Sequence, residues 1–591
     1  MDLRESVIDD EVTNSSSTRS SLFVVLREHA LLGVLATLIV WGLYGSSLQL
    51  PLFFDDLVQF PYVERYTMFE HWLSSNESPY YRPLTVSIWK LLTLLPTGST
   101  AIFSHALNLF LHALNGVFVG MLAGQIFSRF NPVSDQWLQR QMVKSLVATL
   151  YLVLPFHYQA IPWAGALPQI LVTTLVLAAV ISFINQNFGL AWILTLVAPM
   201  AQETGIVLPA IYLLLIAVDF QRSDLGKGIR TMTLFSLPTV IWLAVRFSVS
   251  TARDGVSLFA GWESLWQSTT WSLQGLSWPI TIFGRYIFPF VSINDLLFIW
   301  LLGGGGLLII LIMTSMLNDQ KRNAGKIYLV GIGWVILTIL PAIVVLPFGY
   351  IINSPRLMTL PAVGISLLWG ACIVVGMKLV RQSASVIIRI FSVTILALVV
   401  GATGVSVQTI REEMRLHALL GGAYSQIVVA AEDEFASPEI PVFINFPSSM
   451  APAEKRFVLG NEGVVFWPQY APQHTIISTN SSLSRTDYGF VTIEGIRKQQ
   501  PYLAGIVRPT APFADFENRT DVIFYNTQYS PNTIRVLKAG QISAGVSGAN
   551  LGVFAAEKDG FEIQLRGAEI NETDLNSGRP LALELQWHVS V

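Results

Sequence analysis

The stretch LLGVLATLIVWGLYGSSLQLPLFFDD, residues 31–56, begins as an apolar run and ends in two adjacent carboxylates. Roughly 20 mostly apolar residues can cross a membrane as one helix, and residues 29–50 meet that requirement. Asp55 and Asp56 follow among aromatic side chains rather than in a polar loop. Two neighbouring charges at a water–lipid boundary are costly unless the site is hydrated or lined by cations. The stretch therefore predicts a membrane span that leads either to a solvated helix end or to a polar site.

Long apolar runs and short polar breaks continue from this stretch to residue 408. Of the 591 residues, 52% are hydrophobic and 13% are charged, whereas a typical soluble domain has about 25% charged residues. The net charge of −3 argues against a nucleic-acid partner. The single cysteine, Cys372, excludes an internal disulfide and a cysteine-based metal site. This composition is typical of an integral membrane protein.

Candidate spans can be counted along the whole chain, and about eleven segments qualify. They are 29–50, 101–126, 144–162, 165–184, 188–202, 205–220, 231–249, 296–316, 327–349, 357–378 and 386–408. Lys and Arg are more frequent in the loops on the side of the N-terminus, such as Arg222, Lys227 and Arg230, so the N-terminus is predicted to be cytoplasmic. An odd number of spans then places loops 51–100 and 250–295 and the C-terminal residues on the outer face.

The sequence thus predicts an α-helical polytopic membrane protein of a plasma (inner) membrane with a soluble outer domain. Residues 1–28 are polar and Ser-rich, which is typical of a disordered cytoplasmic tail. Residues 29–408 form the transmembrane domain. Residues 409–591 begin with a helix and continue with short strand-like runs, such as PVFINFP and HTIIST, that turn residues separate. They are expected to form a β-rich or α+β extracytoplasmic domain.

Polar residues recur where apolar runs end on the predicted outer side. They are Asp55, Asp56, Arg82, His105, His157, Gln159, Gln169, Gln202, Glu203, Arg285 and Arg356. Each alone is also explained by a solvated loop end, a turn between spans or an arginine that reaches the headgroups. Together, a carboxylate that accepts a proton and arginines that hold a phosphate suit the activation of a hydroxyl and the departure of a phosphate. The set predicts one polar site on the outer face.

Residues 103–119 carry a polar stripe along a predicted span. His105, Asn108, His112 and Asn115 fall within about 80° of one helix face at 100° per residue. Such a stripe must face protein or a water-filled cavity rather than lipid. Hydrogen bonds to neighbouring helices are the favoured interpretation for the two asparagines. The two histidines are about 10 Å apart by helix rise, which is too far for one metal ion to bind both.

The order of these segments is similar to that of the multispanning GT-C glycosyltransferases. It comprises the acidic pair, YYRPLT, SHALNLFLHALNG, PFHYQAIPWAGALPQIL, APMAQETGIVLPAI and SPRLMTLPAVGISLL. The resemblance covers about residues 30–370. It is greatest to the branch that contains the protein O-mannosyltransferases and the transmembrane–tetratricopeptide mannosyltransferases, although no tetratricopeptide repeats follow the last span.

This resemblance implies a hexosyltransferase of the cell envelope that moves a sugar from a polyprenyl-phosphate donor to a hydroxyl of a protein or glycan acceptor. No other cofactor is predicted, and a divalent metal, while compatible, is not part of the prediction. Asp55 would be the base and Asp56 its helper. The lipid phosphate would be held by Arg356, Arg82 and Arg285. The substrate pocket would be lined by His105, His157, Gln159, Gln169, Gln202 and Glu203.

Two other functions are considered beside this one. A transporter or flippase of a lipid-linked glycan would need polar groups on both membrane faces and an internal repeat, and neither is evident in the sequence. An inactive relative that serves as a scaffold is suggested by departures from the family pattern. Leu154 and Gln159 stand where the family has His and Glu, and Gln202 stands where it has Lys.

Overall fold

A computed structural model of the chain describes most of its helical part and much of its C-terminal part. The described residues are 29–74, 80–130, 137–218, 225–249, 259–289, 291, 295–316, 321–435, 439–444, 446, 449–451, 460, 463–465, 467, 471–472, 474–481, 483, 488–491, 522–530, 533–541, 552–555, 562–570 and 583–590. The tail predicted for residues 1–28 lies outside them. The chain divides into two compact units, residues 1–418 with 449–465 and residues 419–448 with 466–591.

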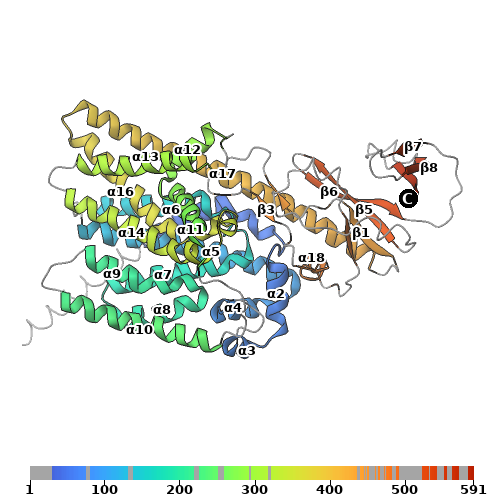
Figure 1. Cartoon of the computed structure of the whole chain (residues 1–591), viewed down its shortest axis with the longest axis horizontal. Helices are drawn as coiled ribbons and strands as arrows, with labels where there is room; N and C mark the ends of the chain where they lie inside the picture. The colour runs from blue at the N-terminus through green and yellow to red at the C-terminus, as the bar shows by residue number, and fades with distance from the viewer. Residues whose placement is uncertain are drawn as a thin grey trace, which may run out of the picture. The chain divides into compact units, whose positions relative to one another are not determined.

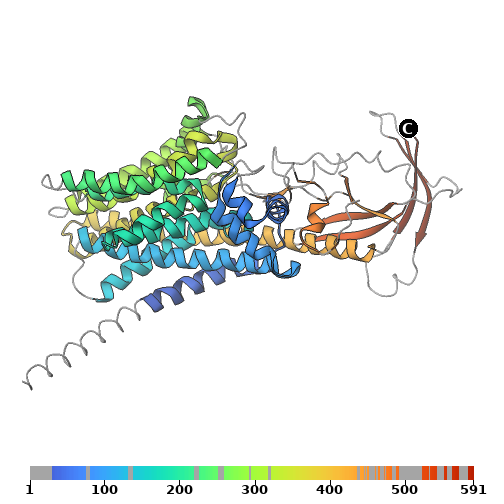
Figure 2. The ribbon, with the colours of Figure 1, turned by 90° about the horizontal axis from the view of Figure 1, so that it is seen from below.

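Eight helices of the described chain are long and apolar enough to cross a membrane. They are the N-terminal helix (His29–Gln49, whose last turn is η1, Gly45–Gln49), α5 (Thr97–Phe130), α7 (Leu167–Ile184), α10 (Leu225–Val249), α13 (Leu296–Ser315), α14 (Lys321–Val345), α16 (Pro361–Gln382) and α17 (Val386–Asp433). Within the first unit the helices run side by side in a bundle (Figures 1 and 2). This arrangement is that of a polytopic membrane protein.

The other three predicted spans fall on shorter helices. These are α6 (Trp137–Val153), α8 (Phe188–Ala201) and α9 (Leu208–Val218), so the count of eleven spans stays a prediction. The predicted span 144–162 is interrupted, because α6 ends at Val153 and η2 (Pro155–Tyr158) follows. Proline has no N–H for the helix and keeps the preceding residue extended, and Leu154 has a φ of −61° and a ψ of 135°.

Short elements connect the long helices and carry most of the polar residues. Loop 51–100 forms α2 (Asp56–Arg65), α3 (Met68–Leu73) and α4 (Pro83–Thr93), and loop 250–295 forms α11 (Trp262–Leu276) and α12 (Trp278–Ile287). The remaining connections are η3 (Ala164–Ala166), η4 (Glu203–Val207), α15 (Phe348–Ile351) and η6 (Pro355–Met358). Helix α2 packs on α4 and η3, and η2 packs on η6, so several of these connections meet.

The second unit contains a mixed four-stranded sheet in the order β4-β1-β5-β6. Strand β1 (Ile440–Ile444) pairs in parallel with β4 (Gly489–Val491) and β5 (Val522–Ser530), and β6 (Thr533–Gln541) is antiparallel to β5. Strands β7 (Gly552–Ala555), β8 (Glu562–Ile570) and β9 (Leu583–Ser590) form an antiparallel sheet. At the end of α17, Glu434 accepts hydrogen bonds from Tyr525 and Lys538, both at 2.9 Å.

One strand prediction in this region is wrong. The run HTIIST forms the short helix α18 (Thr475–Ser478). Its β-branched residues favour a strand, but the Thr475 hydroxyl donates to the Pro472 carbonyl over 2.6 Å, and Ile476 and Ile477 are buried. The short strands β2 (Ser449–Met450) and β3 (Val464–Val465) pair with each other within the first unit.

Candidate functional site

The acidic pair lies in a tight turn at the start of α2. The turn passes through Phe54, whose φ of 56° is unusual for a bulky side chain and marks local strain. Asp55 is half-buried at the N-cap, whereas Asp56 is fully buried, and its Oδ2 accepts a hydrogen bond of 3.1 Å from the Phe53 N–H. The turn therefore gives two adjacent carboxylates different surroundings.

Asp56 faces the segment around η3. A Cβ placed on Gly165 would lie 2.7 Å from Asp56 Oδ1, 2.6 Å from Gln59 Oε1 and 2.8 Å from Trp163 Nε1. Only glycine leaves room for these three polar ends to meet. Burial, together with the negative charge of Asp55, raises the pKa of Asp56 well above its ordinary value, although hydrogen bonding opposes the shift.

Arg356 lies on η6 and reaches the same tryptophan from another direction. Its Nη1 donates to Gln159 Oε1 over 3.0 Å, its Nη2 donates to the Tyr350 hydroxyl over 2.8 Å, and its guanidinium lies 4.6 Å from the Trp163 ring centroid. The residue is 4% exposed. Within the described part of the chain, no carboxylate pairs with it. Trp163 is thus flanked by a buried carboxylate, Asp56, and by a buried cation whose protein partners are neutral.

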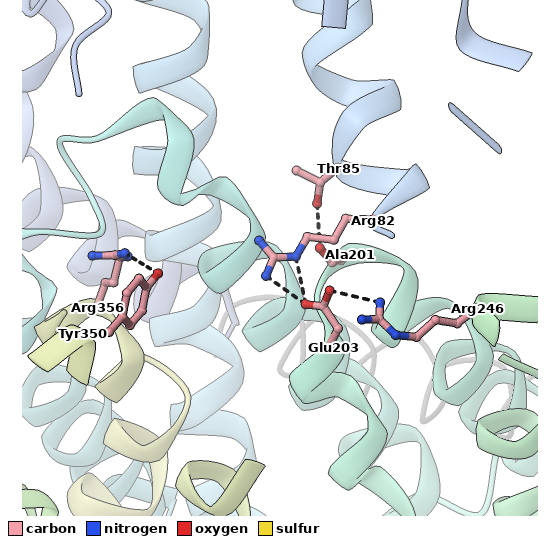
Figure 3. A network of polar contacts seen from close by, with 7 residues as sticks. All are labelled: Arg82, Thr85, Ala201, Glu203, Arg246, Tyr350 and Arg356. Carbon is pink, nitrogen blue, oxygen red and sulfur yellow. Dashed lines mark hydrogen bonds and ion pairs between the residues drawn. The ribbon is translucent and has the colours of Figure 1, made fainter. Parts of the chain in front are cut away.

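Two further arginines share one carboxylate beside this site (Figure 3). Arg82 precedes α4 and binds Glu203 through Nε at 2.9 Å and Nη2 at 2.8 Å. Arg246, near the end of α10, approaches the other oxygen of Glu203 at 3.4 Å. Thr85 donates to the Ala201 carbonyl over 2.9 Å and so ties α4 to the end of α8. Three helices therefore fix the geometry of this ion-pair network.

Glu203 lies between α8 and α9 and stays ionised in this network. Burial alone would raise its pKa, but the charges of Arg82 and Arg246 outweigh that effect and hold the pKa below its ordinary value. Three guanidinium groups and one carboxylate thus lie in this part of the structure (Figure 3). We call the set of Arg82, Glu203, Arg246 and Arg356 the basic cluster.

Tyr80 connects the two parts of the basic cluster. The Arg82 guanidinium lies 4.2 Å from the centroid of the Tyr80 ring. Tyr80 is also close enough to Tyr350, Glu203 and Arg356 to be affected by their charges. The structure therefore brings loop 51–100 close to Glu203, which lies between α8 and α9, and to Arg356 on η6.

Two of the predicted site residues occupy supporting or separate positions. His105 on α5 approaches the Pro51 carbonyl at 3.3 Å, just before the acidic turn. Arg285 on α12 is buried and donates to Gln274 Oε1 over 3.1 Å and to the Val291 carbonyl over 3.3 Å. These partners belong to α11 and to the segment after α12, and the predicted role of Arg285 in phosphate binding stays a prediction.

The three remaining predicted residues differ in their surroundings. His157 on η2 approaches the Tyr151 carbonyl at 2.9 Å, and its ring centroid lies 4.7 Å from that of His112. Gln169 lies on α7, and Gln202 caps α8 and precedes Glu203. Within the described ranges, no hydrogen bond joins either glutamine side chain to the basic cluster. No group of three or more His, Cys, Asp or Glu residues there could hold a metal ion.

Sequence reasoning missed three members of the site. Arg246 was assigned to the predicted span 231–249, although a charge inside an apolar span is itself a signal of function. Trp163 and Tyr350 lie in connections that contain prolines, and aromatic residues there are ordinary at a membrane interface. Only the fold shows that both rings contact Arg356.

Replacing Gly165 by alanine is expected to lower the apparent melting temperature of the full chain by about 2–4 °C, because overpacking costs about 1–3 kcal/mol. The new methyl group must displace the Asp56, Gln59 and Trp163 side chains together. The control is Gly189→Ala on α8, where a Cβ meets nothing within 4 Å. Equal melting temperatures for the two variants would contradict the packing described here.

Comparisons with known proteins add little to this geometry. No protein-family model matches the sequence, and no curated protein matches it. Among solved structures, the chain is similar to the crystal structure of ArnT from Cupriavidus metallidurans bound to undecaprenyl phosphate. The identity is 12%, the TM-score is 0.36, and the alignment covers 84% of this chain and 93% of that chain. A similarity at this level leaves function to be argued from the residues of this chain.

Proposed function

We propose that this protein is a membrane glycosyltransferase that moves a sugar from a polyprenyl-phosphate donor to a hydroxyl group on the outer face of the membrane. The observation that carries the proposal is the arrangement around Trp163. A buried arginine with neutral protein partners, Arg356, lies over its ring, and a buried carboxylate, Asp56, lies beside its indole nitrogen. This arrangement offers an anion site next to a carboxylate pair, as the resemblance to the GT-C enzymes implies.

The basic cluster suits a phosphate group. A buried guanidinium is costly unless an anion compensates its charge, and the protein partners of Arg356 are an amide and a phenol. Arg82 and Arg246 both bind Glu203, and Tyr80 lies within charge range of both Arg82 and Arg356. Arginine presents a fixed fork that matches phosphate oxygens. We expect the donor phosphate to bind between Arg356 and Arg82.

The acidic pair supplies the base. Asp55 is half-buried and therefore accessible to an acceptor, whereas Asp56 is fixed by Phe53 and buried. In the transfer step, the acceptor oxygen forms a bond to the sugar C1 while the bond from C1 to the phosphate oxygen breaks. Asp55 takes the acceptor proton, and the polyprenyl phosphate leaves with the electron pair of the broken bond. Asp56 positions Asp55, and the arginines stabilise the phosphate as its negative charge develops.

The finer assignments follow from the sequence. The lysine and arginine distribution supports a cytoplasmic N-terminus in a plasma membrane and an outer C-terminal domain. Mannose, or a related hexose, is the sugar that the resemblance favours. A protein or a glycan is the acceptor, and the C-terminal domain is a candidate for binding it.

Binding of polyprenyl phosphate to the full chain in detergent tests this function. We expect native mass spectrometry to show at least about tenfold tighter binding of undecaprenyl phosphate than of undecaprenol, because charge-assisted hydrogen bonds contribute about 1.5–3 kcal/mol. Both lipids have the same chain, so the comparison isolates the phosphate. The matched protein control is Arg65→Gln, which removes an exposed arginine at the end of α2. Equal binding of the two lipids by the unmodified chain would contradict the proposal.

A further inference from the structure

Five polar side chains are buried together inside the first unit. They are Tyr44 on the N-terminal helix, His112 and Asn115 on α5, Tyr151 on α6 and His157 on η2, and each is 0% exposed. The His112 ring centroid lies 4.7 Å from that of His157, 5.5 Å from that of Tyr151 and 5.7 Å from that of Tyr44. We call these five residues the histidine cluster.

Most polar atoms of the histidine cluster lack a protein partner within the described residues. They are both ring nitrogens of His112, Nδ1 of His157, the hydroxyl groups of Tyr44 and Tyr151, and Oδ1 of Asn115. His112 lies beside the Leu152 backbone, and Asn115 lies beside the Tyr151 hydroxyl, but neither pair completes a hydrogen bond. Buried polar groups in proteins are nearly all hydrogen-bonded, so six such atoms in one place point to a bound partner.

The chemistry of these atoms identifies that partner. His157 Nε2 approaches the Tyr151 carbonyl at 2.9 Å, and a carbonyl can only accept, so Nε2 carries the proton and Nδ1 is an acceptor. The two tyrosine hydroxyl groups can donate, and a neutral His112 offers one donor and one acceptor. A partner must therefore both donate and accept hydrogen bonds. Water does both and typically makes about three hydrogen bonds when buried.

A metal ion fits the same atoms less well. It would use only the acceptors and leave the tyrosine hydroxyl groups unsatisfied. Its charge would also need a carboxylate or thiolate nearby. Among the described residues, no group of three or more His, Cys, Asp or Glu side chains could hold a metal ion. The cluster itself contains two histidines, two tyrosines and one asparagine, and so brings no carboxylate or thiolate to compensate a cation.

We infer that the histidine cluster binds ordered water molecules, which join the N-terminal helix, α5, α6 and η2 inside the membrane domain. Asn115 Nδ2 already donates to the Ile170 carbonyl on α7 over 3.1 Å, so the network also reaches that helix. The segment η2 ends next to Gln159, the hydrogen-bond partner of Arg356. The water site would therefore help to hold this connection in place. The inference does not depend on the proposed enzyme activity.

The sign of a stability change tests the inference. Tyr151→Phe and Tyr44→Phe are each expected to lower the apparent melting temperature of the full chain by about 1–3 °C, since a satisfied hydroxyl group stabilises the folded state. In a dry site the same changes would remove an unsatisfied group and raise it. Tyr212→Phe calibrates the experiment, because the Tyr212 hydroxyl is buried and bonds to the Thr195 hydroxyl at 3.0 Å. A rise for both cluster variants would overturn the inference.

X-ray hydroxyl-radical labelling of the unmodified chain gives an independent readout, because radicals formed from bound water modify adjacent side chains. We expect labelling of Tyr44, His112 and Tyr151 despite their burial. Trp334 is equally buried but donates to the Leu360 carbonyl at 3.0 Å, so it should stay unlabelled. Absence of labelling in the cluster overturns the inference, whatever the variants do. A melting temperature that rises with added Zn²⁺ and falls with EDTA, but is insensitive to both in His112→Phe, would assign a metal site instead and also overturn it.

Discussion

Replacing Asp55 by asparagine is expected to lower the rate of sugar transfer by about 10²–10⁴-fold, which is the contribution that a positioned general base makes. Asparagine has nearly the same shape but cannot take the acceptor proton at neutral pH. Binding of the lipid phosphate should change by less than about threefold, because the phosphate is held by arginines rather than by Asp55. Single-turnover transfer with purified donor and acceptor measures the rate.

The neighbouring acids make this experiment selective. Glu64→Gln removes an exposed carboxylate from the same helix, α2, and should leave the rate unchanged. Asp56→Asn changes the buried member of the pair, which positions Asp55, and its effect should be smaller than that of Asp55→Asn. Full activity in Asp55→Asn would exclude Asp55 as the base. A large loss confined to Asp56→Asn would assign the base to Asp56.

Replacing Arg356 by methionine is expected to lower the transfer rate by about 10²–10³-fold, the usual effect of removing one group that stabilises a developing anion. The methionine side chain keeps much of the apolar packing over Trp163 but carries no charge. Stability should be unchanged or higher, since the protein partners of this buried cation are neutral. Activity and melting temperature should thus move independently, which a merely structural arginine would not show.

Two further variants separate charge from geometry at this position. Arg356→Lys keeps the charge but loses the planar fork, so it should recover only part of the rate. Arg65→Met removes an exposed arginine at the end of α2 and should leave both rate and stability near those of the unmodified chain. If Arg356→Met transferred sugar at the full rate, the phosphate would have to be held elsewhere.

Much of this site is readable from the sequence because its members lie where apolar runs are interrupted. Arg82 and Glu203 are 121 residues apart, and Gln159 and Arg356 are 197 apart, yet each pair is hydrogen-bonded. Helix ends on one membrane face lie in a single layer. Polar residues at those ends avoid lipid, so they tend to face one another. The charge bias that orders the spans therefore also predicts which residues can meet.

The rotation of each helix about its axis is what the sequence could not provide. Arg285 occurs in a loop predicted to lie on the same outer face, but it binds Gln274 from the preceding helix, α11. His157 faces His112 rather than the basic cluster. In both cases the same residue types would fit either environment. Side-chain packing against neighbouring helices decides which way these residues face. The spacing of polar and apolar residues in one sequence does not reveal that packing.

For the polar stripe on α5, the sequence predicted the hydrogen bonds of the asparagines but not the partner of His112. Asn115 donates to a carbonyl of α7, and Asn108 donates to the Trp163 carbonyl over 2.8 Å, so the hydrogen bonds predicted for the asparagines are confirmed for Asn115 and extend to a connection for Asn108. The stripe faces protein, as expected because polar side chains on a membrane span are costly when they face lipid. The partner of His112 on η2, however, depends on where Pro155 ends α6.

The most direct test of the account is an experimental structure of the full chain in a lipid nanodisc with bound undecaprenyl phosphate. The account predicts that phosphate oxygens lie about 2.7–3.0 Å from guanidinium nitrogens of Arg356 and Arg82, with the Asp55 carboxylate facing the same cavity. A phosphate bound out of hydrogen-bond reach of both arginines, or an Asp55 carboxylate directed away from it, would contradict the claim that these side chains form one sugar-transfer site.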